Sequence, residues 1–88
     1  MASYKVTLKP SVEKDLRSLS KSAIARVVKS LERLTEDPFP RQTLKLEGVE
    51  KLYRLRVGDY RVVYSVNQAP PEIIVHYVRH RRDVYRTL

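Results

Sequence analysis

The sequence predicts an α+β fold in which two helices pack on one face of an antiparallel sheet. Two segments of the N-terminal half space their apolar residues as amphipathic helices do. The segments that follow mostly alternate apolar and polar residues with period two, and short turn signals separate them. Helices followed by a run of strands in this way are typical of α+β domains.

The chain opens with a strand and a first helix. The segment "SYKVTLK" alternates, and it places three apolar side chains on one face: Tyr4, Val6 and Leu8. Pro10 suits the opening turn of a helix, because its missing N–H is not needed there. The apolar residues that follow at helical spacing are Val12, Leu16 and Leu19.

A second helix follows, for which Ser20 or Ser22 is a candidate N-cap. Its predicted core-facing stripe contains five residues: Ile24, Val27, Val28, Leu31 and Leu34. Pro38 and Pro40 end the helix.

The C-terminal half predicts the sheet. "TLKLEG" is a short strand, and Gly58-Asp59 joins two alternating runs as a two-residue type II′ hairpin turn. The last strand, "EIIVHYVRH", is apolar on both faces, as expected well inside a sheet. The main elements follow the order β-α-α-β-β-β, and "RRDVYRTL" is either a short C-terminal helix or a tail.

Length and composition predict a single domain, residues 1–88, that folds around one modest core. Apolar residues make up 42% of the chain and charged residues 32%. The absence of cysteine excludes disulfides and thiolate metal sites. No apolar run approaches membrane-spanning length and no signal sequence is recognisable, so we expect a soluble, cytoplasmic protein without a membrane partner.

The net charge of +8 favours a polyanionic partner, most often nucleic acid. Residues 1–50 hold ten Lys+Arg and seven Asp+Glu, whereas residues 51–88 hold eight and three. Every cation after Lys51 is an arginine, the side chain that grips phosphate through two parallel hydrogen bonds. A basic surface that serves solubility, or an acidic protein partner, would also explain the charge.

The turn register predicts that arginines gather on one face of the hairpin. If Gly58 and Asp59 form the turn, the face for the helices carries six apolar or aromatic residues: Tyr53, Leu55, Val57, Tyr60, Val62 and Tyr64. The solvent face then carries five others: Leu52, Arg54, Arg56, Arg61 and Val63. Arg56 and Arg61 become direct neighbours, an arrangement that costs a few tenths to about 1 kcal/mol unless an anion lies between them. The alternative is that each arginine reaches separately into water.

The end of the last strand adds further candidates. Arg79, Arg81 and Arg82 could bind phosphate, and Tyr85 could stack on a nucleobase or simply pack the C-terminus. His80 lies among cations, which disfavour its protonation, so a neutral imidazole could accept a proton there. His76, within the apolar strand, is interpreted as structural.

The residues present fit RNA cleavage without a metal or a small-molecule cofactor. Two histidines without clustered carboxylates do not predict a metal site, and two glycines do not make a phosphate-binding loop. Cleavage by the adjacent 2′-hydroxyl suits such residues, because the RNA supplies its own nucleophile and the protein need only position it and stabilise charge.

The phrases "YRLRVGDYRVVY" and "HRRDVY" resemble the RelE toxins of the RelE/ParE superfamily, and the resemblance covers nearly the whole chain. It implies a type II toxin with two helices on a four-stranded, mostly antiparallel sheet. It further implies metal-independent cleavage of mRNA in the ribosomal A site, which leaves a 2′,3′-cyclic phosphate, and inhibition by a cognate antitoxin. We expect that antitoxin to be acidic or to carry an amphipathic helix.

The resemblance also implies roles for individual residues. Arg61 matches the arginine that stabilises the transition state, and Tyr85 matches the tyrosine that stacks on the substrate base. Arg81 matches the arginine of charge stabilisation and leaving-group protonation, although an alternative alignment places Arg79 there. Arg54 and Arg56 stand where well-studied members carry lysines, one of them a proposed base.

That departure leaves the general base open, since arginine effectively never deprotonates. His80, Tyr85 or no dedicated base are the alternatives. Two other functions also stay open: a ParE-like inhibitor of DNA gyrase without RNase activity, and a basic RNA-binding module with weak or no catalysis.

Overall fold

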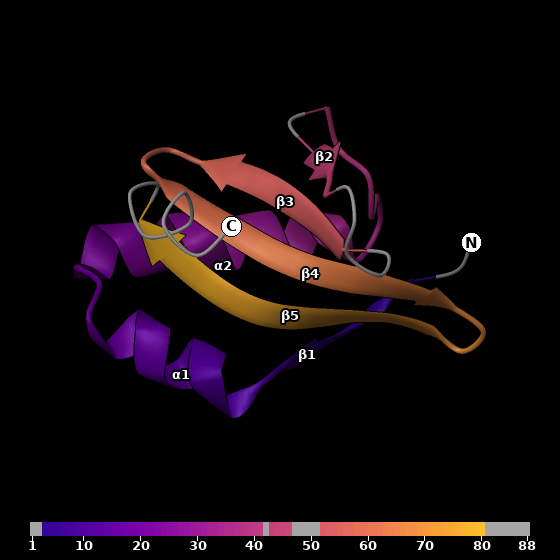
Figure 1. Ribbon diagram of the computed structural model, residues 1–88, viewed down its shortest axis with the longest axis horizontal. Coiled ribbons are helices and arrows are strands. Elements are labelled where there is room, and N and C mark those ends of the chain that lie inside the picture. The colour runs from indigo at the N-terminus through magenta and orange to yellow at the C-terminus, as the bar shows by residue number, and fades with distance from the viewer. Residues whose placement is uncertain (1–2, 42, 47–51, 81–88) are drawn as a thin grey trace.

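Two helices cover one face of a five-stranded sheet in the computed structural model, which describes residues 3–41, 43–46 and 52–80 (Figure 1). The elements, in chain order, are β1 (Lys5–Leu8), α1 (Pro10–Arg17), α2 (Lys21–Leu34), β2 (Thr43–Lys45), β3 (Leu52–Val57), β4 (Tyr60–Gln68) and β5 (Pro71–His80). The strands lie in the order β1-β5-β4-β3-β2, and α2 lies behind the sheet in this view. The segment "RRDVYRTL", for which a short helix and a tail were both expected, falls outside the described residues.

The sheet has five strands, and the prediction of four was wrong. The segment Thr43–Lys45, which lies within the predicted strand "TLKLEG", pairs with β3 as a separate edge strand, and the predicted element order counted one strand too few. β1 runs parallel to β5, with Lys5 opposite Glu72 and Leu8 opposite Val75, while the other three strand pairs are antiparallel. The sheet is therefore mixed but mostly antiparallel, and β5 lies inside it as its apolar faces predicted.

The hairpin of β3 and β4 has the register that its two-residue turn predicted. Gly58 has a φ of 59°, a conformation that glycine adopts without the steric cost of a Cβ. Val57 pairs with Tyr60, and Arg56 pairs with Arg61. Because side chains alternate along each strand, the aromatic and apolar set faces the helices and the arginines face the other way.

Both helices begin where the sequence predicted. Pro10 occupies the first turn of α1, and Ser20 caps α2 by accepting a hydrogen bond from the Ala23 N–H at 3.2 Å. The predicted apolar stripe of α2 was wrong at Val28, which is 41% exposed, whereas Val27 is fully buried. Adjacent residues on a helix point about 100° apart, so only one of the two valines can face the sheet.

The core lies between the helices and the sheet. Val12 of α1 and Leu34 of α2 meet the inward residues of the central strands, among them Tyr64, which has no exposed surface. The Tyr64 hydroxyl donates to the Pro38 carbonyl at 2.6 Å and lies 3.1 Å from the Thr43 hydroxyl, so a buried polar group is fully satisfied. Burial of this side chain raises its pKa.

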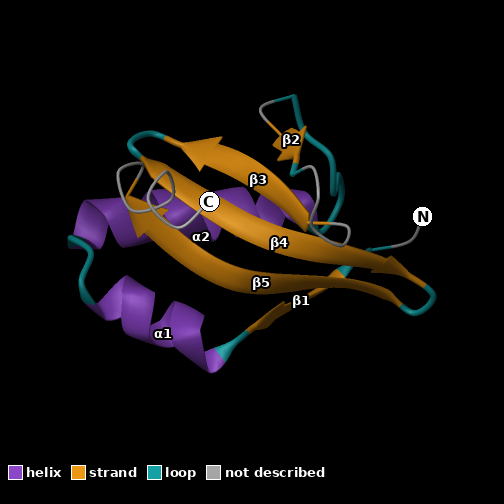
Figure 2. Cartoon of the chain, in the orientation of Figure 1, coloured by secondary structure: helices purple, strands orange, loops and turns teal. Residues whose placement is uncertain are grey.

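Helix α1 covers the part of the β5 edge that β1 does not reach (Figure 2). β1 pairs with β5 only as far as Val75. Beyond that point the Ser11 hydroxyl donates to the His76 carbonyl at 2.8 Å, and the Asp15 carboxylate accepts the Val78 N–H at 3.1 Å. Side chains of α1 thus replace the missing neighbour strand, which leaves less of the edge open for pairing with another chain.

Candidate functional site

Three arginines form a row across the face of the sheet opposite the helices. Arg56 of β3 pairs with Arg61 of β4, and Arg61 pairs in turn with Arg79 of β5. Neighbouring strands lie about 4.8 Å apart, so the three backbone positions span roughly 10 Å. We call this set, Arg56, Arg61 and Arg79, the arginine row. Three arginine side chains that start from neighbouring backbone positions can bring several N–H donors to the oxygens of one phosphodiester.

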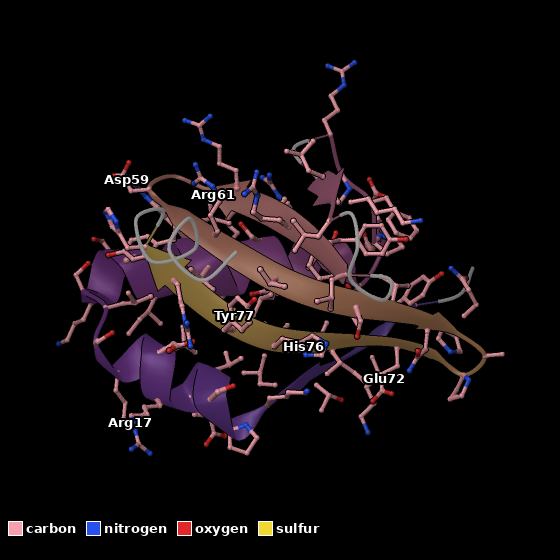
Figure 3. All side chains as sticks on the ribbon, in the orientation of Figure 1. Arg17, Asp59, Arg61, Glu72, His76 and Tyr77 are labelled. Atoms are coloured by element: carbon pink, nitrogen blue, oxygen red, sulfur yellow. The ribbon has the colours of Figure 1, made fainter. Side chains whose placement is uncertain are left out.

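Arg61, at the centre of the row, is buried, with only 7% of its surface exposed. Its Nη1 donates to the carbonyl oxygens of Gly58 at 3.3 Å and Tyr60 at 3.1 Å. The expectation of a solvent-exposed Arg61 was therefore wrong, although the predicted face is correct. The side chain folds back over the hairpin turn because the turn carbonyls offer acceptors within its reach (Figure 3).

Arg54 lies on the same face, one row further from the hairpin turn. It pairs with Leu44 of β2 and with Val63 of β4, and Val63 is fully buried. Arg54 is half-buried, whereas Arg56 is exposed. The two arginines therefore sit in different environments, with Arg56 in the row and Arg54 beside it.

A β-bulge explains how Arg79 enters the row. Ser65 pairs with Ile74 and Tyr64 with Val75, but Val63 then pairs with Tyr77, so that His76 is an extra residue on β5. Without this shift Arg79 would pair with Tyr60 and face the helices, since a slip of one residue moves every side chain to the other face. The sequence pattern of β5 did not reveal the bulge. The signal for it was the spacing from Val75 to Val78, both of which are buried.

The other predicted site residues of the C-terminal segment divide into two groups. His80 pairs with Tyr60 and packs edge-on against its ring, with 5.7 Å between ring centroids. The alternation of side chains puts His80 on the face opposite Arg79, so the structure does not bring this imidazole into the arginine row. Arg81, Arg82 and Tyr85 lie outside the described residues.

His76, the bulge residue, makes a polar contact on the face of the sheet opposite the helices. Its Nε2 lies 3.0 Å from the Ser65 hydroxyl. Burial, with the charge of Lys9 as a smaller cause, lowers the pKa of His76 below its ordinary value of 6.5. These contacts support the structural role expected for this histidine.

The lowered pKa of His76 predicts that the protein loses stability in mild acid. The unfolded chain takes up a proton near pH 6.5 more readily than the folded protein does. The free energy of unfolding is therefore expected to fall as the pH drops below 6.5 through the folded pKa. Urea unfolding at about pH 7.5 and about pH 5.5 measures this, and His76→Gln should show a smaller difference. An equal difference in both proteins would contradict the assignment to His76.

The described residues contain no group of three or more His, Cys, Asp and Glu side chains placed to hold a metal ion. They also contain no helix with the length and apolar character that a membrane crossing requires.

Comparison with known proteins identifies the family. Residues 6–85 match the family model described as the ParE toxin of the type II toxin–antitoxin system parDE. The chain is 29% identical over 86 residues to the protein named RelE1 of Methanocaldococcus jannaschii, covering 94% of this chain and 96% of that one.

The fold matches solved structures of RelE proteins along most of the chain. The RelE of the Pyrococcus horikoshii RelE–RelB complex is 38% identical, with a TM-score of 0.80 over 90% of this chain and 96% of its own. The matching chain of the Escherichia coli RelBE toxin–antitoxin complex is 26% identical, with a TM-score of 0.75 over 88% of this chain and 95% of its own. The chain therefore belongs to the ParE toxin family of type II toxin–antitoxin systems, and it is a RelE-like toxin of the RelE/ParE superfamily.

Proposed function

We propose that this toxin is a metal-independent endoribonuclease that cleaves mRNA on the ribosome in the cytoplasm and thereby stops translation. The observation that carries the proposal is the arginine row, in which three arginine residues pair across neighbouring strands. A toxin that acts on RNA needs such a surface at the scissile phosphate. The similarity to RelE structures along most of the chain supports the same reading.

The chemistry is an attack of the 2′-hydroxyl on the adjacent phosphorus, which gives a 2′,3′-cyclic phosphate and releases the 5′-oxygen of the next nucleotide. The phosphorane that forms carries extra negative charge on its non-bridging oxygens. Arg61 binds the turn carbonyls through Nη1. A guanidinium carries further N–H donors at Nε and Nη2, and in this proposal these donate to the non-bridging oxygens. A donor already fixed in place stabilises the transition state without a cost of reorganisation.

Positioning and charge stabilisation carry most of the proposed catalysis. Arg54 and Arg56 stay charged and cannot act as bases. His80 lies on the other face of the sheet, so Tyr85 is the remaining candidate among the proposed base residues. Arg79 stands beside Arg61 in the row, and this favours Arg79 over Arg81 as the second charge-stabilising arginine. Arg82 remains a proposed contact to the RNA backbone.

The proposed protein partner is a cognate antitoxin. The Pyrococcus horikoshii and Escherichia coli relatives were solved as complexes with RelB. A net charge of +8 favours an acidic antitoxin segment or an amphipathic helix with acidic residues. Such a segment would compete with RNA if it covered the arginine row.

The second candidate function is inhibition of DNA gyrase. The description of the matching family favours it, because that family is defined by ParE toxins. Gyrase inhibition does not need an RNA-cleaving site, so it assigns no catalytic role to the arginine row.

One experiment separates the candidates. Purified toxin is incubated with ribosomes that carry a defined message, with the same message alone, and with gyrase and supercoiled DNA. Ribosome-dependent cleavage with 2′,3′-cyclic ends supports the proposal. Trapped gyrase–DNA complexes with intact message would support the ParE-like function instead. Binding of RNA without either effect would leave a non-catalytic RNA-binding module.

A further inference from the structure

Tyr77 lies next to Arg79 on the face of the sheet opposite the helices, and its ring contacts the Arg79 guanidinium. The guanidinium carbon of Arg79 is 4.7 Å from the centre of the Tyr77 ring. A guanidinium over an aromatic face at this distance is attracted by the negative charge of the ring face. Both side chains are half-buried, so water screens this attraction only in part.

The bulge at His76 brings these two residues to the correct face. Tyr77 pairs with Val63, and Arg79 pairs with Arg61, so both side chains stand on the side of the sheet opposite the helices. In a regular ladder both would point toward the helices instead. The same irregularity that completes the arginine row therefore also places an aromatic ring beside its last member.

Arg79 needs such a support more than Arg61 does. Arg61 is held by hydrogen bonds to the carbonyls of the hairpin turn. Arg79 instead has the positive charge of Arg61 directly beside it on the neighbouring strand. Like charges on neighbouring strands repel, and a long arginine side chain can turn away. The ring of Tyr77, which pairs with Val63 on the same face, offers a neutral contact that holds the guanidinium of Arg79 near the sheet.

We propose that Tyr77 is a positioning residue that orients the Arg79 guanidinium for contact with the scissile phosphate. This role rests on the proposed RNase function. It acts through Arg79, and Tyr77 itself need not contact the reacting atoms. The ring is what matters, and the hydroxyl is not required.

The test compares Tyr77→Leu, which removes the ring but keeps an apolar side chain, with Tyr77→Phe, which keeps the ring. Single-turnover cleavage of ribosome-bound message is expected to slow on the order of 3–30-fold in Tyr77→Leu, the range of a partly buried cation–π contact. Tyr77→Phe should cleave within about twofold of wild type. In an Arg79→Ala background, Tyr77→Leu should cause no further loss, since its effect passes through Arg79.

Two controls separate positioning from a general loss of structure. Tyr4→Leu removes a half-buried tyrosine whose hydroxyl donates to the Gln68 side chain, away from the row, and should cleave like wild type. The NMR signal of the Arg79 Nε–H reports the stacking directly and needs no activity. Its ring-current shift should be present in wild type and Tyr77→Phe and absent in Tyr77→Leu.

Each outcome decides a separate point. A folded Tyr77→Leu protein that cleaves at the wild-type rate overturns the proposal. So does a Tyr77→Leu loss of equal size with and without Arg79, because the ring would then act by another route. If wild-type protein does not cleave message at all, the RNase function fails. The NMR shift then decides separately whether Tyr77 orients Arg79, and its absence in wild type would overturn that as well.

Discussion

Replacing Arg61 with alanine is expected to slow cleavage of ribosome-bound message by on the order of 10²–10³-fold while the protein stays folded. Arg61 is the central member of the arginine row, and its guanidinium is held by the turn carbonyls before any substrate arrives. Ribosome association is spread over many phosphate contacts, so the affinity should fall far less than the rate. Arg61→Lys should rescue only part of the rate, because an ammonium cannot grip two phosphate oxygens as a fork.

The buried position of Arg61 changes the stability expected for this variant. On a solvent-exposed side chain, the loss of repulsion from Arg56 would have left the melting temperature unchanged or raised it. The structure shows two hydrogen bonds and a side chain that is only 7% exposed, and alanine removes all of these contacts. We therefore expect Arg61→Ala to unfold more easily, by about 1–2 kcal/mol.

A matched control variant tests whether lower stability alone explains the lost activity. Tyr64→Phe removes the hydroxyl that donates to the Pro38 carbonyl, and this residue faces the helices. It should cost roughly 1 kcal/mol of stability and leave cleavage at the wild-type rate. If Arg61→Ala cleaved like wild type, or if Tyr64→Phe lost as much activity, Arg61 would not be the charge-stabilising group.

The hairpin could be predicted residue by residue because its determinants are local. A two-residue turn at Gly58 fixes the register of the strands beside it, and alternation then fixes which side chains share a face. The burial of Arg61 could not be read in the same way. It depends on where a long, flexible side chain finds acceptors, and alternation gives only its starting direction.

The interior of β5 shows where sequence patterns fail. Its apolar residues on both faces predicted a central strand, and β5 does lie between β1 and β4. The same lack of alternation hid the bulge at His76, so His80 was grouped with the arginines and Tyr77 was overlooked. The segment "TLKLEG" was predicted as a strand and does pair with β3, so only the total of four strands was wrong, because the predicted element order held one strand fewer than the predicted segments.

Arg79 lies at the β5 end of the row, and the geometry favours it as the second charge-stabilising arginine. The sequence resemblance favours Arg81 instead. Arg79→Ala is expected to slow cleavage by on the order of 10²-fold, close to the effect of losing Arg61, because both would stabilise the same phosphorane. The double variant should therefore lose less than the product of the two single effects, as expected of groups that act together. Single-turnover rates of the two single variants and the double variant measure this.

The control for Arg79→Ala must remove the same charge from another part of the molecule. Arg17, which is exposed in the last turn of α1, serves this purpose, because Arg17→Ala lowers the net charge equally, away from the arginine row. It should weaken ribosome binding slightly and leave the cleavage rate unchanged. Arg81→Ala completes the comparison, since the alignment that favours Arg81 predicts the larger loss there. A protein that loses cleavage with Arg81→Ala but keeps it with Arg79→Ala would show that the row ends at Arg61 for catalysis, with Arg79 holding only the RNA backbone.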